Sequence, residues 1–406
     1  MGVAVGGGDR VTDGRLRVLL WSIKGAGPHY GGPGTSALRL YNTDPGRFHL
    51  ELAHGRPDHE PEPVFEAQHL VRPFVGTTLG QIAYIRAGVR WMREHAERYD
   101  AIHALQGFEF TVTPCVEAER RGTPCAVKIA AHDADIADKS GWRGTLRIAQ
   151  RRRERLKRLS AVIAISSQIE QELLSYGFDP DKIARIPNGV NTDRFRPVAD
   201  HAARSDARGM LGWADRPTIL CVGGVTPRKR QHLLLAALQL AGEQGIDAQL
   251  ALVGPPNDAY LQSLREEATR RGVADRLVHT PFLADPTPAY HAADVFALPS
   301  ESEGMPNAVL EAMACGLPIV GTRISGTTDL VIDGQTGVLI EPSEEQAAGA
   351  CVGYLSNASA RDMHGQASRA RVEAKFSANA VLCAHEQLFE ALKSRSAPAQ
   401  ASIRTA

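Results

Sequence analysis

Residues 300–320 read SESEGMPNAVLEAMACGLPIV, and the order of residue types in this stretch decides the fold class. The run DVFALPS that leads into it is apolar and typical of a buried parallel strand. Pro306 fits the first position of a helix, where its missing N–H costs nothing, and residues 307–316 continue as a helix that closes on a glycine. A buried strand followed at once by a helix is the unit of an α/β domain with a parallel sheet.

The same alternation extends in both directions. Apolar runs at residues 16–23, 99–107, 124–133 and 160–167 alternate with helical patterns in the first half. The segment IPNGVNTDRFRP, residues 186–197, predicts a connector because it combines two prolines with an Asn-Gly turn. After it the alternation restarts with PTILCVGG and AQLALVG. We therefore expect an α/β chain of two doubly wound Rossmann-like domains, with ligands at the carboxyl ends of the strands in an interdomain cleft.

Bulk properties limit the function classes. A length of 406 residues favours two domains. Basic and acidic residues number 46 each, which gives no electrostatic argument for a nucleic-acid partner. The six cysteines are scattered without a C-x-x-C pair, and no stretch has the length of a membrane span or the composition of a signal peptide. We predict reduced thiols, a cytoplasmic protein and loose tails at residues 1–14 and 393–406.

The opening stretch also predicts a ligand site. The start of its helix is expected to point backbone N–H groups into the cleft, where they suit a phosphate. Glu303 and Glu311 flank this start, and carboxylates accept hydrogen bonds from hydroxyl groups. A nucleotide sugar, with a diphosphate between two hydroxylated rings, satisfies all three parts. The alternative to a ligand site is a structural one, in which Glu311 is a solvated helix glutamate and Glu303 a side chain that caps the helix. The residues of the helix start are Gly304, Met305, Pro306 and Asn307.

A second anion site is predicted at CVGGVTPRKRQHL, residues 221–233. A strand ends at Gly223-Gly224, and Arg228, Lys229 and Arg230 follow just before a predicted helix. Cations at the carboxyl end of a strand, beside a helix N-terminus, suit a diphosphate. The alternative is an exposed basic turn.

A glycine-rich loop, KGAGPHYGGPGTSALRL, follows the first predicted strand. Glycines allow close approach of a ligand to the backbone. Residues 32–37 match G-x-G-x-x-A, the dinucleotide fingerprint, and Glu51 lies about where a ribose-binding acid would be. The match is weak because eight residues separate Gly32 from Ile23 at the end of the strand. It keeps a nicotinamide-dependent oxidoreductase open as an alternative.

Three further sequence features each allow a functional and a structural interpretation. His132 closes the strand at residues 124–133 and is either a cleft residue or a structural histidine. Asp133 and Asp135 form a D-x-D pair of the kind that can hold a divalent metal under a diphosphate, although so short a match is common by chance. Arg151 to Arg158 carry six cations and one glutamate. That run favours a solvated helix face, with contact to anionic lipid headgroups as the alternative.

Together these motifs resemble the retaining glycosyltransferases of family 4, which have the GT-B fold. PSESEGMPNAVLEAMACGLPIVGT resembles the E-x7-E segment of that family, and IPNGVNTDRFRP, VIDGQTGVLI and YGGPGTSALRL resemble its connector, late loop-strand and glycine loop. The resemblance covers about residues 16–390. It implies an acceptor-binding domain at residues 1–190, a nucleotide-sugar-binding domain at 191–375, and a C-terminal helix within 376–406 that returns to the first domain before a disordered tail.

The resemblance also implies roles for the predicted site. Glu303 would bind hydroxyls of the donor sugar, Glu311 the nucleotide ribose and Lys229 the phosphate. One departure is that Gly224 stands where the family usually has an arginine, so Arg228 or Arg230 would supply the second cation. The remaining implied positions are amides near Gly31, Gly32 and Met305 for the diphosphate, His132 at the reaction centre, and Phe282 and Leu283 for backbone contacts with the base.

The predicted function is therefore transfer of a sugar from a nucleoside-diphosphate donor, with uridine expected from family frequency, to a hydroxyl of a saccharide, lipid-linked saccharide or small metabolite. Charge on the departing diphosphate would be stabilised by Lys229, a neighbouring arginine and the helix start, so we expect no metal and no other cofactor. A same-face displacement is the expected route to retention. The alternatives are the oxidoreductase, a nucleotide-sugar epimerase and a binding protein with the same fold.

Overall fold

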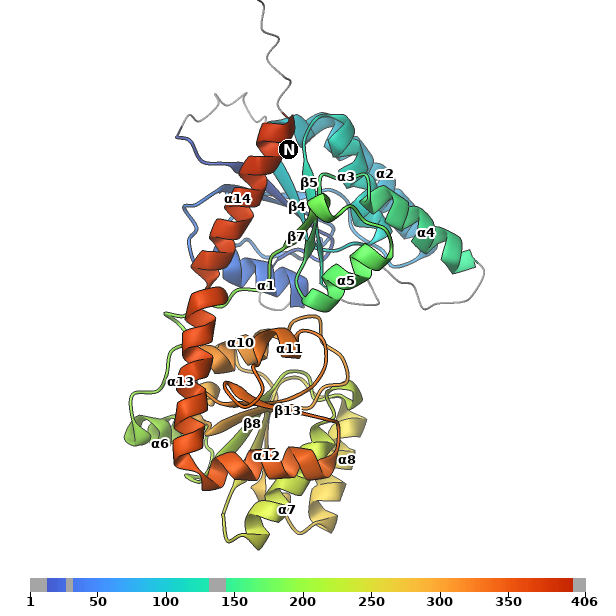
Figure 1. Ribbon diagram of the computed structural model, residues 1–406. Helices are drawn as coiled ribbons and strands as arrows, with labels where there is room; N and C mark the ends of the chain where they lie inside the picture. Colours follow the sequence, from blue (N-terminus) through green and yellow to red (C-terminus); the bar gives the residue numbers. More distant parts are fainter. Residues whose placement is uncertain (1–12, 27–31, 131–143, 397–406) are drawn as a thin grey trace, which may run out of the picture.

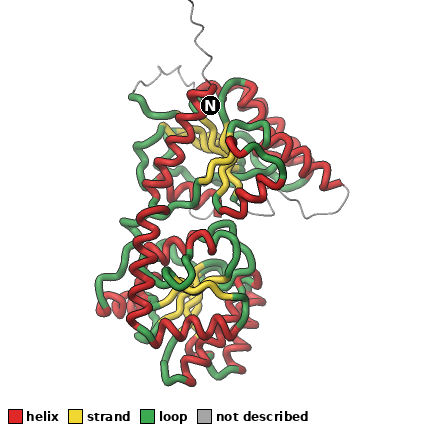
Figure 2. Tube along the Cα trace, in the orientation of Figure 1, coloured by secondary structure: helices red, strands yellow, loops and turns green. Residues whose placement is uncertain are grey.

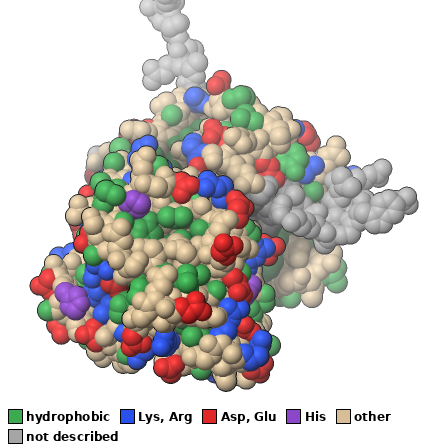
Figure 3. All heavy atoms as spheres, turned by 60° about the horizontal axis from the view of Figure 1, so that its bottom comes forward, with side chains coloured by type: hydrophobic (Ala, Val, Ile, Leu, Met, Phe, Trp, Pro, Cys, Tyr) green, Lys and Arg blue, Asp and Glu red, His purple; other side chains and the backbone are tan. Residues whose placement is uncertain are grey.

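The computed structural model describes residues 13–26, 32–130 and 144–396, which form two α/β domains (Figure 1). Each domain has a central parallel sheet enclosed by helices (Figure 2). The predicted fold class, two doubly wound domains, is therefore confirmed. The face in Figure 3 carries basic and acidic side chains interspersed, in keeping with the equal numbers of the two charge types.

The first sheet has seven strands in the order β3-β2-β1-β4-β5-β6-β7. In β1 all residues but Arg17 are buried, because helices cover both faces of the sheet. The strands are β1 (Arg17–Ser22), β2 (His49–His54), β3 (Ala67–Leu70), β4 (Ala101–Ala104), β5 (Cys125–Ile129), β6 (Ala161–Ala164) and β7 (Ile183–Arg185). The helices are α1 (Gly32–Tyr41), α2 (Thr78–His95), α3 (Glu109–Arg120), α4 (Gly144–Leu156) and α5 (Ser167–Ser175).

The second sheet has six strands in the order β10-β9-β8-β11-β12-β13. The strands are β8 (Thr218–Val222), β9 (Gln249–Val253), β10 (Leu277–Thr280), β11 (Val295–Leu298), β12 (Ile319–Thr322) and β13 (Gly337–Ile340). The helices are α6 (His201–Met210), α7 (Leu235–Glu243), α8 (Asp258–Arg270), α9 (Thr287–Ala292), α10 (Asn307–Ala314), α11 (Thr327–Leu330), α12 (Glu344–Ser356) and α13 (Ala358–Lys375).

The last helix, α14 (Ala378–Ser396), leaves the second domain and packs on the first (Figure 1). Its Leu382, Phe389 and Leu392 share a buried cluster with Leu20 and Leu52 of the first sheet. The chain therefore crosses between the domains twice, once after β7 and once between α13 and α14.

Two helix starts differ from the prediction. α10 begins at Asn307, one residue later than expected, because Pro306 keeps an extended backbone with φ −76° and ψ 111°. α7 begins only at Leu235, because the cations lie in a 3-10 turn at Pro227–Lys229 and Arg230 has a left-handed backbone with φ 52°. Five of the six cysteines are buried free thiols, and Cys383 is an exposed one.

Candidate functional site

The carboxyl ends of the two sheets meet at the loop between β11 and α10. This loop fits only because residue 304 is a glycine: a Cβ atom there would lie 2.1 Å from the carbonyl oxygen of Ala130, which follows β5 in the other domain. Gly326, with φ +76°, backs the loop from its own domain, since a Cβ there would lie 2.4 Å from the Gly304 oxygen. The segment before α10 is thus held in direct contact with the first domain.

Glu303 lies in this loop and is paired with two cations. The Nζ atom of Lys229 donates to Oε1 of Glu303 at 2.5 Å, and Nη1 of Arg228 lies 3.3 Å from the same oxygen. Arg228 also donates to the Ser302 carbonyl. Only 12% of the Glu303 and Lys229 side chains is exposed, so a ligand that reaches this point meets a largely desolvated carboxylate and ammonium.

The turn after β8 positions these cations. Gly223 has φ +140°, and the side chain of Lys229 folds over it, with Nζ 3.5 Å from where a Cβ atom would lie. Arg230 points elsewhere, with Nη2 3.8 Å from a carboxylate oxygen of Glu301. Of the two arginines considered as substitutes at Gly224, Arg228 is the one in contact with Glu303.

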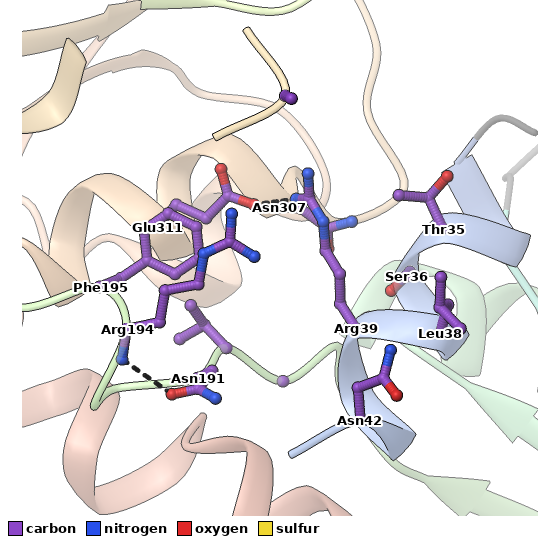
Figure 4. Close-up of a pocket in the computed structure, with 13 residues that line it drawn as sticks. Thr35, Ser36, Leu38, Arg39, Asn42, Asn191, Arg194, Phe195, Asn307 and Glu311 are labelled. Atoms are coloured by element: carbon purple, nitrogen blue, oxygen red, sulfur yellow. Dashed lines mark hydrogen bonds and ion pairs between the residues drawn. The ribbon is translucent and has the colours of Figure 1, made fainter. Parts of the chain in front are cut away.

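Glu311 lies on the buried face of α10 and joins the two domains. Arg39, on α1 of the first domain, donates to Oε1 of Glu311 (Figure 4). The Tyr290 hydroxyl donates to Oε2 at 2.7 Å. Burial raises the pKa of the Glu311 carboxyl, and the charge of Arg39 opposes that rise. The carboxylate therefore has one oxygen fixed by its own domain and one held by the opposite domain.

A first cavity of about 300 Å³ surrounds this ion pair. Figure 4 shows Arg39 extending from α1 toward Glu311, with Arg194 and Phe195 of the connector on the other side. The lining residues are Thr35, Ser36, Leu38, Arg39, Asn42, Gly189, Val190, Asn191, Arg194, Phe195, Ala284, Asn307 and Glu311.

A second cavity, also of about 300 Å³, lies between the first turn of α1, the ends of β4 and β5, and the start of α10. It brings together Gly32 with four predicted residues of the other domain, Glu303, Gly304, Met305 and Asn307. The full lining is Gly32, Pro33, Ser36, Gln106, Phe108, Lys128, Ala130, Ile165, Asn188, Glu303, Gly304, Met305 and Asn307.

The remaining predicted residues lie apart or outside the described part of the chain. Phe282 and Leu283 follow β10, and neither lines the two cavities; Phe282 is 52% exposed. Gly31, His132 and the D-x-D pair fall outside the described residues. Sequence reasoning missed Arg39, Lys128, Asn188 and Tyr290 as site residues. Arg39 and Asn188 lie in the glycine loop and the connector, but those motifs gave their side chains no role, and Lys128 and Tyr290 lie in no recognised site motif.

The dinucleotide fingerprint is not placed as such a fingerprint requires. Gly32 and Gly34 lie within the first turn of α1, and Glu51 on β2 accepts hydrogen bonds from His69 and Tyr99, both at 2.7 Å. The basic run at the end of α4 and just after it makes contacts within the domain: Arg155 pairs with Glu109, and Lys157 with Glu154 at 2.8 Å. Among the described helices, none is long and apolar enough to cross a membrane.

Curated relatives match this chain over part of its length. A GDP-mannose-dependent alpha-(1-6)-phosphatidylinositol monomannoside mannosyltransferase of Mycolicibacterium smegmatis is 35% identical over 225 residues, which cover 53% of this chain and 58% of that protein. A D-inositol 3-phosphate glycosyltransferase of Geodermatophilus obscurus is 38% identical over 189 residues, covering 43% and 40%. The chain thus spans about half the length of the curated relatives it matches.

Solved structures and family models match most of the chain. Anabaena HepE, crystallised with UDP and glucose, has a TM-score of 0.73 at 21% identity, covering 94% of this chain and 100% of that one. Sucrose-phosphate synthase of Thermosynechococcus elongatus has a TM-score of 0.75 at 22% identity, with the same coverage. The family model of a glycosyl transferase 4-like domain matches residues 31–189, and that of glycosyl transferases group 1 matches residues 216–357. The chain therefore belongs to the group 1, family 4 glycosyltransferases, with the GT-B fold.

Proposed function

We propose that this protein is a retaining glycosyltransferase that moves a sugar from a nucleoside-diphosphate donor to a hydroxyl group of an acceptor. The observation that carries the proposal is the second cavity, where the start of α10 and Glu303, itself bound to Lys229, face the first turn of α1. A carboxylate for sugar hydroxyls, cations for a diphosphate and backbone amides of a helix start are thus gathered at the edges of two parallel sheets.

Transfer breaks the bond between the anomeric carbon and a phosphate oxygen, so negative charge builds on the departing diphosphate. Donors that are already oriented toward that charge lower the barrier most. In the structure, Lys229 and Arg228 bind the Glu303 carboxylate. A bound donor would replace these contacts, because its phosphates accept hydrogen bonds from the two cations while its sugar hydroxyls donate to the carboxylate. Because these cations would neutralise the charge on the departing diphosphate, we predict that no metal ion is needed for that role.

Glu311 would bind the nucleotide ribose in the first cavity, which shares the lining residues Ser36 and Asn307 with the second. Retention follows from a same-face displacement assisted by the leaving phosphate. Its support is that Glu303 is the single carboxylate among the described residues lining the second cavity, and it is occupied by cations. His132 at the reaction centre stays a prediction, as do backbone contacts of the base with Phe282 and Leu283.

The donor base and the acceptor are inferred by class. Uridine stays the predicted base, with guanosine as the rival, because the M. smegmatis relative is named for GDP-mannose while HepE was crystallised with UDP. Two relatives are named for acceptors that contain a phosphorylated inositol, a lipid in one case and a small metabolite in the other. Contact of Arg151–Arg158 with an anionic membrane is a further proposal, which a vesicle sedimentation assay would test. Cytoplasmic location stays a prediction.

The experiment is a thermal-shift screen of UDP and GDP followed by a turnover assay. A nucleotide at 100 times its dissociation constant should stabilise the fold by about 2.7 kcal/mol. The nucleotide that binds then sets the donor panel, and release of free nucleoside diphosphate is measured with inositol phosphate, phosphatidylinositol vesicles and saccharide acceptors. Binding of NADH without binding of either nucleotide would overturn the proposal in favour of an oxidoreductase.

A further inference from the structure

Lys128 is a buried cation on the wall of the second cavity. It lies on β5, its neighbours Val127 and Ile129 belong to the apolar core, and only 4% of its surface is exposed. Its side chain reaches the cavity that also contains Gly32, Glu303 and Gly304. No step of the mechanism described so far uses it.

The ammonium group has no counter-charge within the described part of the chain. No carboxylate of those residues lies within 4.0 Å of it, and its one hydrogen bond runs from Nζ to Oδ1 of Asn188 at 2.8 Å. An ammonium has three N–H donors, and a buried charge without a partner is costly. The fold thus retains, beside a cavity, a cation that an anionic ligand would satisfy.

The titratable neighbours do not provide that negative charge. His103 on β4 and His385 on α14 are buried, and a histidine is either neutral or positive. Burial lowers the pKa of each, that of His385 to about 4, so both are neutral near pH 7. Glu303, across the cavity, is bound to Lys229 and Arg228. Burial also lowers the pKa of Lys128 to about 8, which leaves it mostly charged at pH 7 and mostly neutral at pH 9.

Asn188 links this cation to the start of α10. Its Nδ2 donates to the Met305 carbonyl at 3.1 Å and to Oδ1 of Asn307 at 3.0 Å, while its Oδ1 accepts from Lys128. The amide is therefore oriented from both sides. Lys128 is held in a fixed relation to the helix start at which the proposed diphosphate binds.

We infer that Lys128 binds a phosphate group brought into the second cavity by a substrate. This inference rests on the proposed function, since it adds a cation from the first domain to a site whose other cations come from the second. The phosphate belongs either to the donor diphosphate or to a phosphorylated acceptor such as an inositol phosphate. Both sources present the same anionic oxygens to the ammonium.

The test uses the full chain, its Lys128→Met variant, and calorimetric titration with UDP or GDP, whichever binds, at pH 7 and pH 9. For wild type we expect about fivefold weaker binding at pH 9, because a lysine with a pKa about 8 is then about one-tenth charged and its neutral form binds like the methionine variant. Lys128→Met should bind about tenfold more weakly at pH 7 and lose the pH dependence. Lys128→Arg, charged at both pH values, should bind without pH dependence.

A second arm distinguishes the sources. If nucleotide binding is unchanged in Lys128→Met, the two proteins are saturated with nucleotide and titrated with inorganic phosphate and with inositol phosphate. A weaker response in the variant assigns Lys128 to the acceptor phosphate.

Equal responses in both arms, with equal melting temperatures, would overturn the inference. If Lys128→Met does not fold, pH-independent affinity of the wild type in both arms would overturn it instead. If Lys229→Met weakens nucleotide binding while Lys128→Met changes neither nucleotide binding nor the phosphate response, the inference about Lys128 fails and the proposed function stands. If the wild type binds no nucleotide, the inference and the proposed function both fail.

Discussion

Replacement of Glu311 by glutamine separates a ribose contact from an interdomain ion pair. The carboxylate is buried and accepts from Arg39 of the opposite domain and from Tyr290 of its own. Glu311→Gln keeps the size of the side chain and an oxygen for the Tyr290 hydroxyl, but removes the charge. If Glu311 binds the ribose, nucleotide affinity depends on that charge.

The magnitudes follow from the exposure and charge of the partners. A hydrogen bond to a charged group contributes about 1.5–3 kcal/mol and one between neutral groups about 0.5–1.5 kcal/mol. Loss of the charge should therefore weaken nucleotide binding by about 1–1.5 kcal/mol, or roughly five- to tenfold. The side chain of Arg39 is 37% exposed and can turn to solvent, so the lost ion pair should cost the fold no more than about 1 kcal/mol.

The assay is calorimetric titration of the nucleotide combined with thermal unfolding, and Arg39→Met is the matched control. This control breaks the same ion pair but leaves the carboxylate, so it should bind nucleotide at least as tightly as wild type. Glu311→Gln should melt within a few degrees of wild type, whereas Arg39→Met leaves a buried carboxylate without its counter-charge and should melt lower. The reasoning is refuted if Arg39→Met weakens nucleotide binding as much as Glu311→Gln, because the ion pair itself, not a ribose contact, would then determine affinity.

Three further predictions concern the second domain. Lys229→Met should lower turnover about 10²–10³-fold in the nucleotide-release assay with little change in melting temperature, whereas Arg230→Met, which removes a cation that does not contact Glu303, should keep most activity; equal losses would contradict the role of Lys229. Gly224→Arg should restore the cation that the family usually has at this place and raise nucleotide affinity about tenfold in calorimetry. A side chain fits there, since a Cβ meets its nearest atoms at 3.6 and 3.7 Å; unchanged affinity in a folded variant would show that a cation at residue 224 does not contribute to binding. Gly304→Ala places a Cβ 2.1 Å from a carbonyl of the first domain, so small-angle scattering should show a larger radius of gyration and turnover should fall; an unchanged scattering profile would disprove the close fit.

The sheets were predictable where strands are buried on both faces. Parallel strands such as β6 and β11 are continuous apolar runs, which the composition of a short window reveals. The edge strand β3, with the sequence AQHL, is partly exposed and gives no such signal. The late start of α7 depends on Pro227 and on the left-handed backbone of Arg230, which apolar periodicity does not report.

The site was predictable only where one short segment carries it. Glu303 and Glu311 share a strand–helix unit, so their spacing relates them to the helix start. Arg39 and Lys128 reach the same cavities from the other domain, and their partners are 272 and 60 residues away in the chain. No local pattern encodes either contact, and the Arg39–Glu311 pair exists only once the two sheets face each other.

The return of α14 to the first domain has a consequence for how the protein is made. The apolar side of that helix completes a core whose last strand, β7, is synthesised about 190 residues earlier. At a translation rate of ~5–20 residues per second, the apolar surface of the first domain that α14 covers stays exposed for roughly 10–40 s during synthesis. The second domain, complete at α13, is expected to fold on the ribosome first, although it is translated second.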